Sequence, residues 1–381
     1  MNKKPIVFVN QSSGYLMIDI IHAVGKHYTK SVLIAGTINP RNNPLGDGVT
    51  VEKMVPINRK STLKRLISWS LGFLKALYLV KTKYRNAHLF LTTNPPFAPL
   101  IPLFCNNSYT LLVYDVYPDV LTEFKLLGKG SFIVKLWQKA NRKVYAKADQ
   151  LFTISEGMKR CMEHYSGENP VQVVPVWTDN QFLKPVVKAQ NPFVISQGLQ
   201  DKFIVLYSGN LGYTHELDVI LEIAAQMKRP DLFFLIIGDG EKKSLLQQKI
   251  SEDGLTNCRI LPWQPVEMLP YSLASADLGI VSLGKGASLL SVPSKTFNLL
   301  SVGAPLLCIA SDESELSGLV HQHKIGKCFT PDQVQEMIAY IENLADNREY
   351  HQTLSGNALK TSEQYGPENA ERFAEELILK S

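Results

Sequence analysis

The stretch with the clearest chemical character is residues 291–305, which read SVPSKTFNLLSVGAP. An apolar helical pattern runs through it, and Gly303 with Pro305 closes the predicted helix. Lys295 falls in the first turn of this helix, where unpaired backbone N–H groups already make the potential positive. A lysine suits that position when an anion binds beside it, so the pattern predicts an anion site. The alternative is that Lys295 is a surface lysine on a packing helix.

Two further stretches carry glycines directly after apolar runs that are typical of strands: YSGNLGYTHELD (207–218) and LIIGDGEKK (235–243). Gly209 and Gly212 would let the backbone approach a ligand, and Gly238 and Gly240 flank Asp239. A glycine after a strand is often only a turn. Three such segments at successive strand ends nevertheless favour a phosphate site, because parallel strands present their carboxyl ends at one edge.

The elements that must position these residues alternate short β-branched runs with amphipathic helical patterns. Parallel sheets require such crossovers, so the sequence predicts an α/β protein with two doubly wound domains. Residues 179–202 show no sustained period and are predicted to be a linker, and 367–381 to be an amphipathic helix. The predicted strands are 6–10, 31–35, 88–92, 110–114, 150–154, 171–174, 203–208, 232–238, 259–261, 278–281 and 306–310.

The composition narrows the class of protein. The chain has 381 residues, 45% hydrophobic and 20% charged, which favours two folded domains over disorder. Its five cysteines are far apart without a CxxC pair, so we expect no disulfide framework, no zinc site and a reducing cytosol. The apolar run after Pro5 is too short for a signal peptide, and the apolar stretch 88–104 contains four prolines, so no membrane span is expected.

Charge is distributed unevenly along the chain. Residues 1–178 hold 23 Lys and Arg against 10 Asp and Glu, a net charge of +13. The remaining residues hold 17 against 25, a net charge of −8. A basic half joined to an acidic half suggests that one domain faces an anionic surface.

Residues 61–85, STLKRLISWSLGFLKALYLVKTKYR, combine basic and apolar side chains on one predicted helix with Ser61 at its N-cap. Trp69, Phe73 and Leu77 would supply apolar area, and the lysines and arginines would supply attraction to anionic lipid. This composition is typical of a helix that lies in the plane of a membrane surface. The other interpretation is a core helix with a solvated basic face.

The order of these motifs resembles a known family. SGNLG, IGDG, ADLGIV and SVPSKTFNLLSVGAP follow one another as in the donor-binding domain of GT-B glycosyltransferases of family 4. VYDVYPDVLTEF (113–124), YAKADQLFTISEGMKR (145–160) and VVPVWTDNQF (173–182) are similar to the bacterial subgroup that builds capsular and O-antigen polysaccharides. The resemblance implies two Rossmann-like domains facing a cleft. Residues 1–178 would bind the acceptor, with a helix at 366–381 packing back on them, and 179–365 would bind the nucleotide sugar.

The resemblance also implies a donor site around the glycine turns and the segment of Lys295. Lys295 would neutralise the leaving diphosphate, Trp263 would lie near the base, and Asn298 would bond the ribose. Trp263 could instead be a partly buried packing residue, and Asn298 could cap a neighbouring loop. The implied donor-binding residues are Gly14, Ser208, Gly209, Asn210, His215, Gly238, Asp239, Gly240, Trp263, Ser291, Ser294, Lys295 and Asn298.

The chain departs from the family pattern at two places. Asn210 and His215 stand where the family often has Arg and Lys, and Leu290 and Asn298 stand where it has a pair of glutamates. Lys295 is then left as the best cation for the leaving diphosphate. Because the chain also has no D-x-D motif, the resemblance implies a reaction without metal.

In the first half, Asp115 follows a predicted strand and would face the cleft, where it would orient the acceptor or a sugar hydroxyl as a catalytic residue. Its alternative role is to cap a helix. Tyr114 replaces a histidine common at this place in the family, so no catalytic histidine is expected there. Gly14 stands in NQSSGY, which lacks the full G-x-G-x-x-G, and this argues against a dinucleotide dehydrogenase.

These implications predict a retaining glycosyltransferase without cofactor or metal. It would move a sugar from a nucleoside diphosphate sugar, UDP-linked, to a polyprenyl-diphosphate-linked saccharide. It would be cytoplasmic and peripheral on the inner face of the cell membrane, bound to the anionic surface and not to nucleic acid. Two other classes remain: a nucleotide-sugar 2-epimerase of the same fold, and a non-catalytic membrane-associated scaffold.

Overall fold

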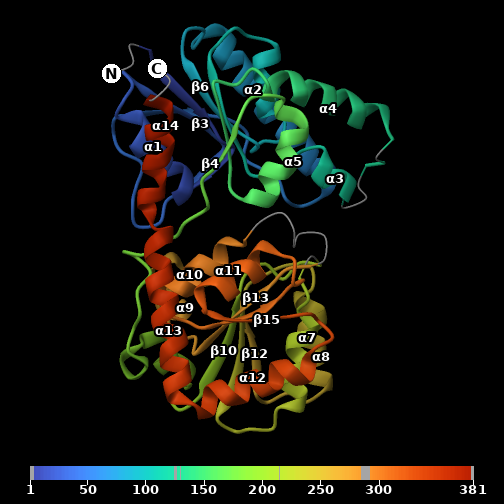
Figure 1. Ribbon diagram of the computed structural model, residues 1–381, viewed down its shortest axis with the longest axis vertical. Coiled ribbons are helices and arrows are strands. Elements are labelled where there is room, and N and C mark those ends of the chain that lie inside the picture. The colour runs from blue at the N-terminus through green and yellow to red at the C-terminus, as the bar shows by residue number, and fades with distance from the viewer. Residues whose placement is uncertain (1–3, 124–126, 129, 214, 285–291, 379–381) are drawn as a thin grey trace. The chain divides into compact units, whose positions relative to one another are not determined.

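The computed structural model describes residues 4–123, 127–128, 130–213, 215–284 and 292–378 (Figure 1). The chain divides into two compact units, Met1–Val176 with Pro367–Ser381, and Trp177–Gly366. Each unit is built around one parallel sheet with helices between its strands. Within the described ranges, no helix is both long enough and apolar enough to cross a bilayer.

The main sheet of the first unit has seven parallel strands in the order β5-β3-β1-β6-β7-β8-β9. All residues of β1, β3, β6, β7 and β8 are buried, as expected for a sheet covered on both faces. The direction of the strand order reverses at β1, and doubly wound folds bind ligands beside such a reversal. The strands are β1 (Ile6–Val9), β3 (Ser31–Ala35), β5 (Val49–Lys53), β6 (His88–Thr92), β7 (Tyr109–Val113), β8 (Gln150–Thr153) and β9 (Val171–Val173), with β2 (Ser12–Gly14) and β4 (Thr37–Asn39) forming a separate pair.

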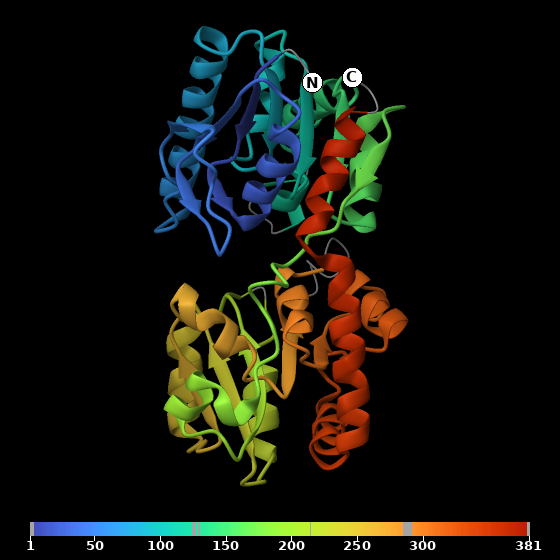
Figure 2. The same cartoon turned by 90° about the vertical axis from the view of Figure 1, so that its left-hand side faces the viewer.

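The last helix of the chain belongs to the first unit. Helix α14 lies against α1, as Figures 1 and 2 show. Its Phe373 is 1% exposed and packs against the rings of Phe90 and Phe152, with centroids 6.1 and 4.7 Å away. The helices of this unit are α1 (Tyr15–Gly25), α2 (Thr62–Thr82), η1 (Ala98–Leu103), α3 (Asp119–Glu123), α4 (Phe132–Tyr145), α5 (Glu156–Ser166), η5 (Pro367–Ala370) and α14 (Glu371–Ile378).

The second unit contains six parallel strands in the order β12-β11-β10-β13-β14-β15, with its reversal between β10 and β13. The strands are β10 (Phe203–Ser208), β11 (Leu232–Ile237), β12 (Cys258–Leu261), β13 (Leu278–Ser282), β14 (Leu306–Ile309) and β15 (Gly326–Phe329). The helices are η2 (Lys188–Gln190), α6 (Pro192–Gln197), α7 (Asp218–Gln226), α8 (Lys243–Glu252), η3 (Val266–Met268), α9 (Leu269–Leu273), α10 (Ser294–Ser301), α11 (Glu315–His323), α12 (Val334–Asp346), α13 (Arg348–Ser362) and η4 (Glu363–Tyr365).

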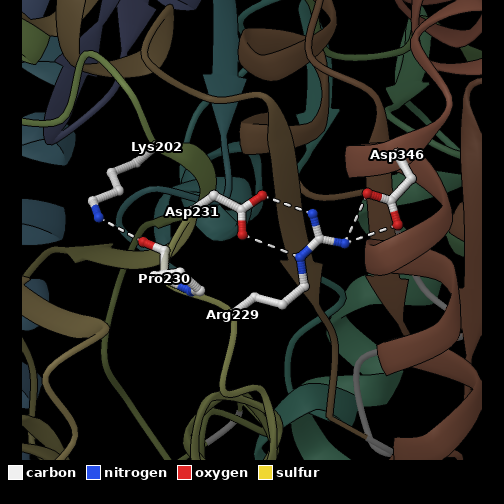
Figure 3. A network of polar contacts seen from close by, with 5 residues as sticks. All are labelled: Lys202, Arg229, Pro230, Asp231 and Asp346. Carbon is white, nitrogen blue, oxygen red and sulfur yellow. Dashed lines mark hydrogen bonds and ion pairs between the residues drawn. The ribbon is translucent and has the colours of Figure 1, made fainter.

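The amino-terminal end of β11 is tied to the end of α12 through Arg229 (Figure 3). Its guanidinium donates to Asp231 at 2.7 Å and to Asp346 at 2.8 Å, and Lys202 donates to the carbonyl of Pro230. Arg229 thereby lowers the pKa of the Asp231 carboxyl. This network lies at the sheet edge opposite the glycine turns. Because Arg229 is already paired with both Asp231 and Asp346, we assign the network a structural role.

Two parts of the predicted element map are corrected. The predicted strands are all present, but the edge strands β5 and β15 were not predicted, because VTVEK and GKCF mix polar with apolar residues. Residues 179–202 are not a plain linker, since they contain η2 and α6. Asn191 caps α6 through its side chain, and Gly198 ends the helix in the left-handed conformation. Six helical residues are too few to show a period in the sequence.

Candidate functional site

The glycine turns after β10 and β11 are packed directly on each other. The backbone N–H of Gly209 donates to the carbonyl of Ile237 at 2.9 Å, and that of Leu211 to Asp239 at 2.8 Å. A Cβ on Gly238 would lie 2.0 Å from the carbonyl oxygen of Gly209. Gly238 is therefore required by the contact between the two turns. The sequence predicts Gly238 as a donor-binding residue beside Asp239, and that role stays a prediction.

Lys295, the second residue of α10, reaches back to the first of these turns. Its Nζ donates to the hydroxyl of Tyr207 at 2.9 Å and lies 4.3 Å from the centre of that ring. A Cβ on Gly209 would lie only 2.6 Å from the same Nζ, so this glycine makes room for the ammonium group. Lys295 forms no ion pair with a carboxylate of the described residues.

Burial lowers the pKa of Lys295 to about 7, because the surrounding protein replaces the water that would solvate its charge. The charged form of Lys295 is therefore energetically costly, and no carboxylate of the described residues pairs with it to offset that cost. An anion arriving beside it would favour the charged form. This arrangement is suited to binding a phosphate group and to stabilising charge that develops on it.

Tyr207 is a site residue that sequence reasoning did not identify. It is fully buried in β10, and its hydroxyl donates to the carbonyl of Asn210 at 2.7 Å while accepting from Lys295. It therefore fixes both the turn and the lysine. In the sequence, Tyr207 cannot be distinguished from the other apolar residues of its predicted strand. Its role in positioning Lys295 follows only from the contacts of its hydroxyl group.

His215 does not provide a second cation. Its Nδ1 lies 2.9 Å from the carbonyl oxygen of Ser282, so Nδ1 carries the proton. Burial and the nearby Lys295 charge lower the pKa of His215 to about 4, and the imidazole is neutral at pH 7. His215 is held at the end of β13, beside the ring of Tyr207.

The structure brings some of the other predicted donor residues to the same edge. Ser208 ends β10, Asp239 is exposed between its glycines, and Ser294 is exposed at the start of α10. Gly240 is required by packing, because its Cβ would lie 2.6 Å from the backbone of Leu211. Ser291 and Leu290 lie outside the described residues.

The two remaining predicted donor residues of the second unit are Trp263 and Asn298. Trp263 stands in the loop after β12 and is 53% exposed, so much of its ring is available for contact. Asn298, one helical turn after Lys295, accepts a hydrogen bond from Thr178 through Oδ1 at 2.8 Å. The structure therefore gives Asn298 a role in holding the segment of Thr178 against α10, and its role toward ribose stays a prediction.

In the first unit, Gly14 and Asp115 lie near the carboxyl ends of their strands. Gly14 precedes α1, and a Cβ there would meet nothing within 4 Å, so packing does not require this glycine. Asp115 is exposed, and its backbone N–H donates to the hydroxyl of Thr93 at 3.2 Å. The next helix begins at Asp119, so Asp115 does not occupy the N-cap position of that helix.

Helix α2 exposes a different apolar set from the predicted one. Trp69, Phe73 and Leu77 are half-buried, and Trp69 and Phe73 pack edge-on against Tyr117 and Phe97 at 6.2 and 6.4 Å. The helix is nevertheless unlike a core helix, because large apolar side chains on it face solvent. Those at least 45% exposed are Leu63, Leu66, Ile67, Leu71, Leu74 and Tyr78.

Comparisons with known proteins agree with this geometry. Residues 193–361 match the family model described as Glycosyl transferases group 1. The chain is 25% identical over 297 residues to the probable glycosyltransferase WbjE of Pseudomonas aeruginosa, covering 75% of this chain and 74% of that protein. It is 30% identical over 218 residues to the putative colanic acid biosynthesis glycosyl transferase WcaI of Escherichia coli (strain K12), covering 56% and 54%.

Among solved structures, Anabaena HepE in complex with UDP-glucose superposes with a TM-score of 0.72 at 16% identity, covering 99% of this chain and all of that one. At this identity the likeness concerns the fold. The predicted fold class is confirmed, and the names of the relatives support a glycosyltransferase. The protein has the GT-B fold, and its second unit contains the region that matches the Glycosyl transferases group 1 family.

Proposed function

We propose that this protein transfers a sugar from a nucleoside diphosphate sugar, UDP-linked, to a lipid-linked saccharide acceptor, with retention and without a metal ion. The observation that carries the proposal is the ammonium of the half-buried Lys295, which lies at the strand-order reversal of the second unit and pairs with no carboxylate of the described residues. The bound UDP-glucose of HepE and the colanic acid pathway in the name of WcaI support the donor and the product class.

In the proposed reaction, the bond between the sugar C1 and the β-phosphate oxygen breaks while the acceptor oxygen bonds to C1. The acceptor proton passes to the leaving phosphate, so no dedicated protein base is needed. Lys295 stabilises the negative charge that grows on that phosphate, with Tyr207 as its positioning residue. Asp115 keeps its proposed role in orienting a hydroxyl group.

We also place the enzyme on the cytoplasmic face of the cell membrane. The first unit, residues 1–176 with 367–381, holds 25 Lys and Arg against 14 Asp and Glu, a net charge of +11. Helix α2 adds exposed apolar side chains to this basic unit. Apolar area beside basic residues is the composition that adsorbs to anionic lipid.

The first test is a thermal-shift screen of UDP, GDP and ADP with their sugars, on the wild type and on Lys295→Ala. A ligand that binds only the native state stabilises it by about 2.7 kcal/mol at a hundredfold excess over Kd. We expect UDP and a UDP-sugar to give the largest shift, and Lys295→Ala to lose most of it. No shift with any nucleotide would favour the scaffold and contradict the proposal.

The second test separates transfer from epimerisation. The donor found in the screen is incubated with the protein, with and without a lipid-linked saccharide, and the sugar is analysed by mass spectrometry and NMR. The proposal expects an intact donor without acceptor, and a glycosylated lipid with it. An isomerised nucleotide sugar formed from the donor alone would identify a 2-epimerase.

A further inference from the structure

A groove of about 590 Å³ lies between residues 55–60 and the first half of α2, a size ordinary for a ligand site. Its walls include the side chains of Val55, Ile57, Ile67 and Leu71. Three of these are far from buried, with Val55 40%, Ile67 50% and Leu71 46% exposed. The groove therefore offers apolar surface that the described residues leave exposed.

The groove is held open by buried hydrogen bonds. The side-chain amide of Gln11, itself fully buried, donates to the carbonyls of Val55 and Ser68 at 2.7 and 2.8 Å. The backbone N–H of Asn58 donates to the hydroxyl of Ser68 at 3.1 Å. These bonds fix both walls to the end of β1, so the groove has a defined shape.

Three cations complete the lining: Arg59, Lys60 and Lys64. All three are exposed, and no carboxylate of the described residues forms an ion pair with them. By contrast, Lys83, the C-cap residue of the same helix, forms an ion pair with Glu52. No Asp or Glu lines the groove. Its charge therefore favours an anionic group over a neutral or zwitterionic one.

The groove also lies at the edge of the sheet where ligands bind in doubly wound folds. Residues 55–60 follow the carboxyl end of β5, as Gly14 and Asp115 follow the ends of β1 and β7. A molecule seated in the groove would thus lie at the same edge of the sheet as the proposed acceptor-orienting carboxylate.

We infer that the groove binds the lipid end of the acceptor, a prenyl chain that ends in a diphosphate. The chain packs on the four apolar side chains, and the diphosphate lies among Arg59, Lys60 and Lys64. This combination of one apolar groove with three unpaired cations matches an amphiphile with an anionic head. The inference rests on the proposed function, since it specifies the acceptor of that reaction.

The test titrates the full chain with farnesyl diphosphate, inorganic pyrophosphate and farnesol below the micelle concentration, by calorimetry. The groove variants are Lys64→Glu and Ile67→Asp. Matched controls are Lys75→Glu and Leu74→Asp, which change exposed residues further along the same helix, outside the groove. Circular dichroism and the UDP thermal shift are recorded for every variant.

We expect farnesyl diphosphate to bind at least about tenfold more tightly than pyrophosphate or farnesol, which corresponds to about 1.4 kcal/mol. Each groove variant should weaken it at least tenfold, with the controls within twofold. Equal loss in the controls would mean adsorption to the whole helix, and equal binding of pyrophosphate would mean a plain anion site; either result overturns the groove. An absent UDP shift with intact groove selectivity would contradict the proposed function instead.

Discussion

Replacing Lys295 by alanine should remove most of the turnover and leave the fold intact. The ammonium is held by the Tyr207 hydroxyl at 2.9 Å and packs against Gly209, at the end of β10. A unit charge about 4 Å from a developing phosphate charge is worth about 4 kcal/mol at the effective dielectric of a partly buried site. Removing one such contact typically costs about 2.7–4 kcal/mol, so we expect kcat to fall about 100–1,000-fold.

The pH dependence gives the same prediction a second readout. Because burial lowers the pKa of Lys295 to about 7, the free enzyme loses this charge as the pH rises through neutrality. We therefore expect kcat/KM to fall by up to about tenfold per pH unit above about pH 7, since kcat/KM reports the ionisation of the free enzyme. Lys295→Arg keeps a guanidinium that stays charged, so its residual activity should lack this decline.

The free energy of unfolding should rise with pH over the range in which kcat/KM falls. The pKa of Lys295 is about 7 in the native protein and 10.5 in the unfolded chain. Between these values the unfolded state binds more protons, so the free energy of unfolding contributed by this group rises with pH. Lys295→Ala removes that contribution, and below pH 7 it should melt no lower than the wild type.

The assay is donor consumption under single-turnover conditions between about pH 6 and 9, a range that spans the lowered pKa. Urea unfolding at the same pH values serves as the folding control. Activity of Lys295→Ala within threefold of the wild type, with unchanged stability, would remove Lys295 from the site. A flat wild-type pH profile would contradict the lowered pKa.

Three other predictions are simpler. Gly209→Ala places a methyl group 2.6 Å from the Lys295 Nζ and should lower kcat at least about tenfold, whereas Gly14→Ala meets nothing within 4 Å and should not change the melting temperature. Activity should persist in excess EDTA, because the chain has no D-x-D motif; loss restored by Mg²⁺ or Mn²⁺ would contradict the metal-free proposal. Wild-type protein should float with anionic vesicles at low salt and less at high salt. The double substitution Leu63→Asp with Leu74→Asp should abolish flotation. Wild-type protein that does not float with anionic vesicles at low salt would contradict a membrane role for α2.

The fold could be predicted because its central strands are buried on both faces and therefore read as continuous apolar runs. β1, IVFV, and β11, LFFLII, are such runs, and both were predicted. The edge strand β5 was missed because none of its five residues is buried and two are exposed, so polar residues alternate with valines in VTVEK and no apolar run appears. Helix α6 was missed because six residues are too few to show a helical period. Its two ends are nevertheless marked in the sequence by Asn191–Pro192 and by Gly198.

The candidate site was predictable where it depends on local chemistry. Lys295 at a helix start and the glycines after β10 and β11 could be read from spacing. The contacts that decide their roles are non-local: the Lys295–Tyr207 bond joins residues 88 positions apart. The clash that requires Gly238 likewise involves another turn, so spacing alone could not show why that residue is a glycine.

The net charge of the first sequence half does not show how the charged residues of the first unit are distributed over its surface. The fold separates basic helices from acidic ones. Helices α2 and α4 contain eight Lys and Arg and no Asp or Glu. Helices α1 and α14, which pack together, contain four Asp and Glu and one Arg. Right-handed crossovers place α1 on the face of the sheet opposite α2 and α4, because they run in opposite directions along the strand order. An anionic bilayer would therefore meet the face of α2, where the groove lies, and the vesicle and farnesyl diphosphate experiments separate these two uses of one helix.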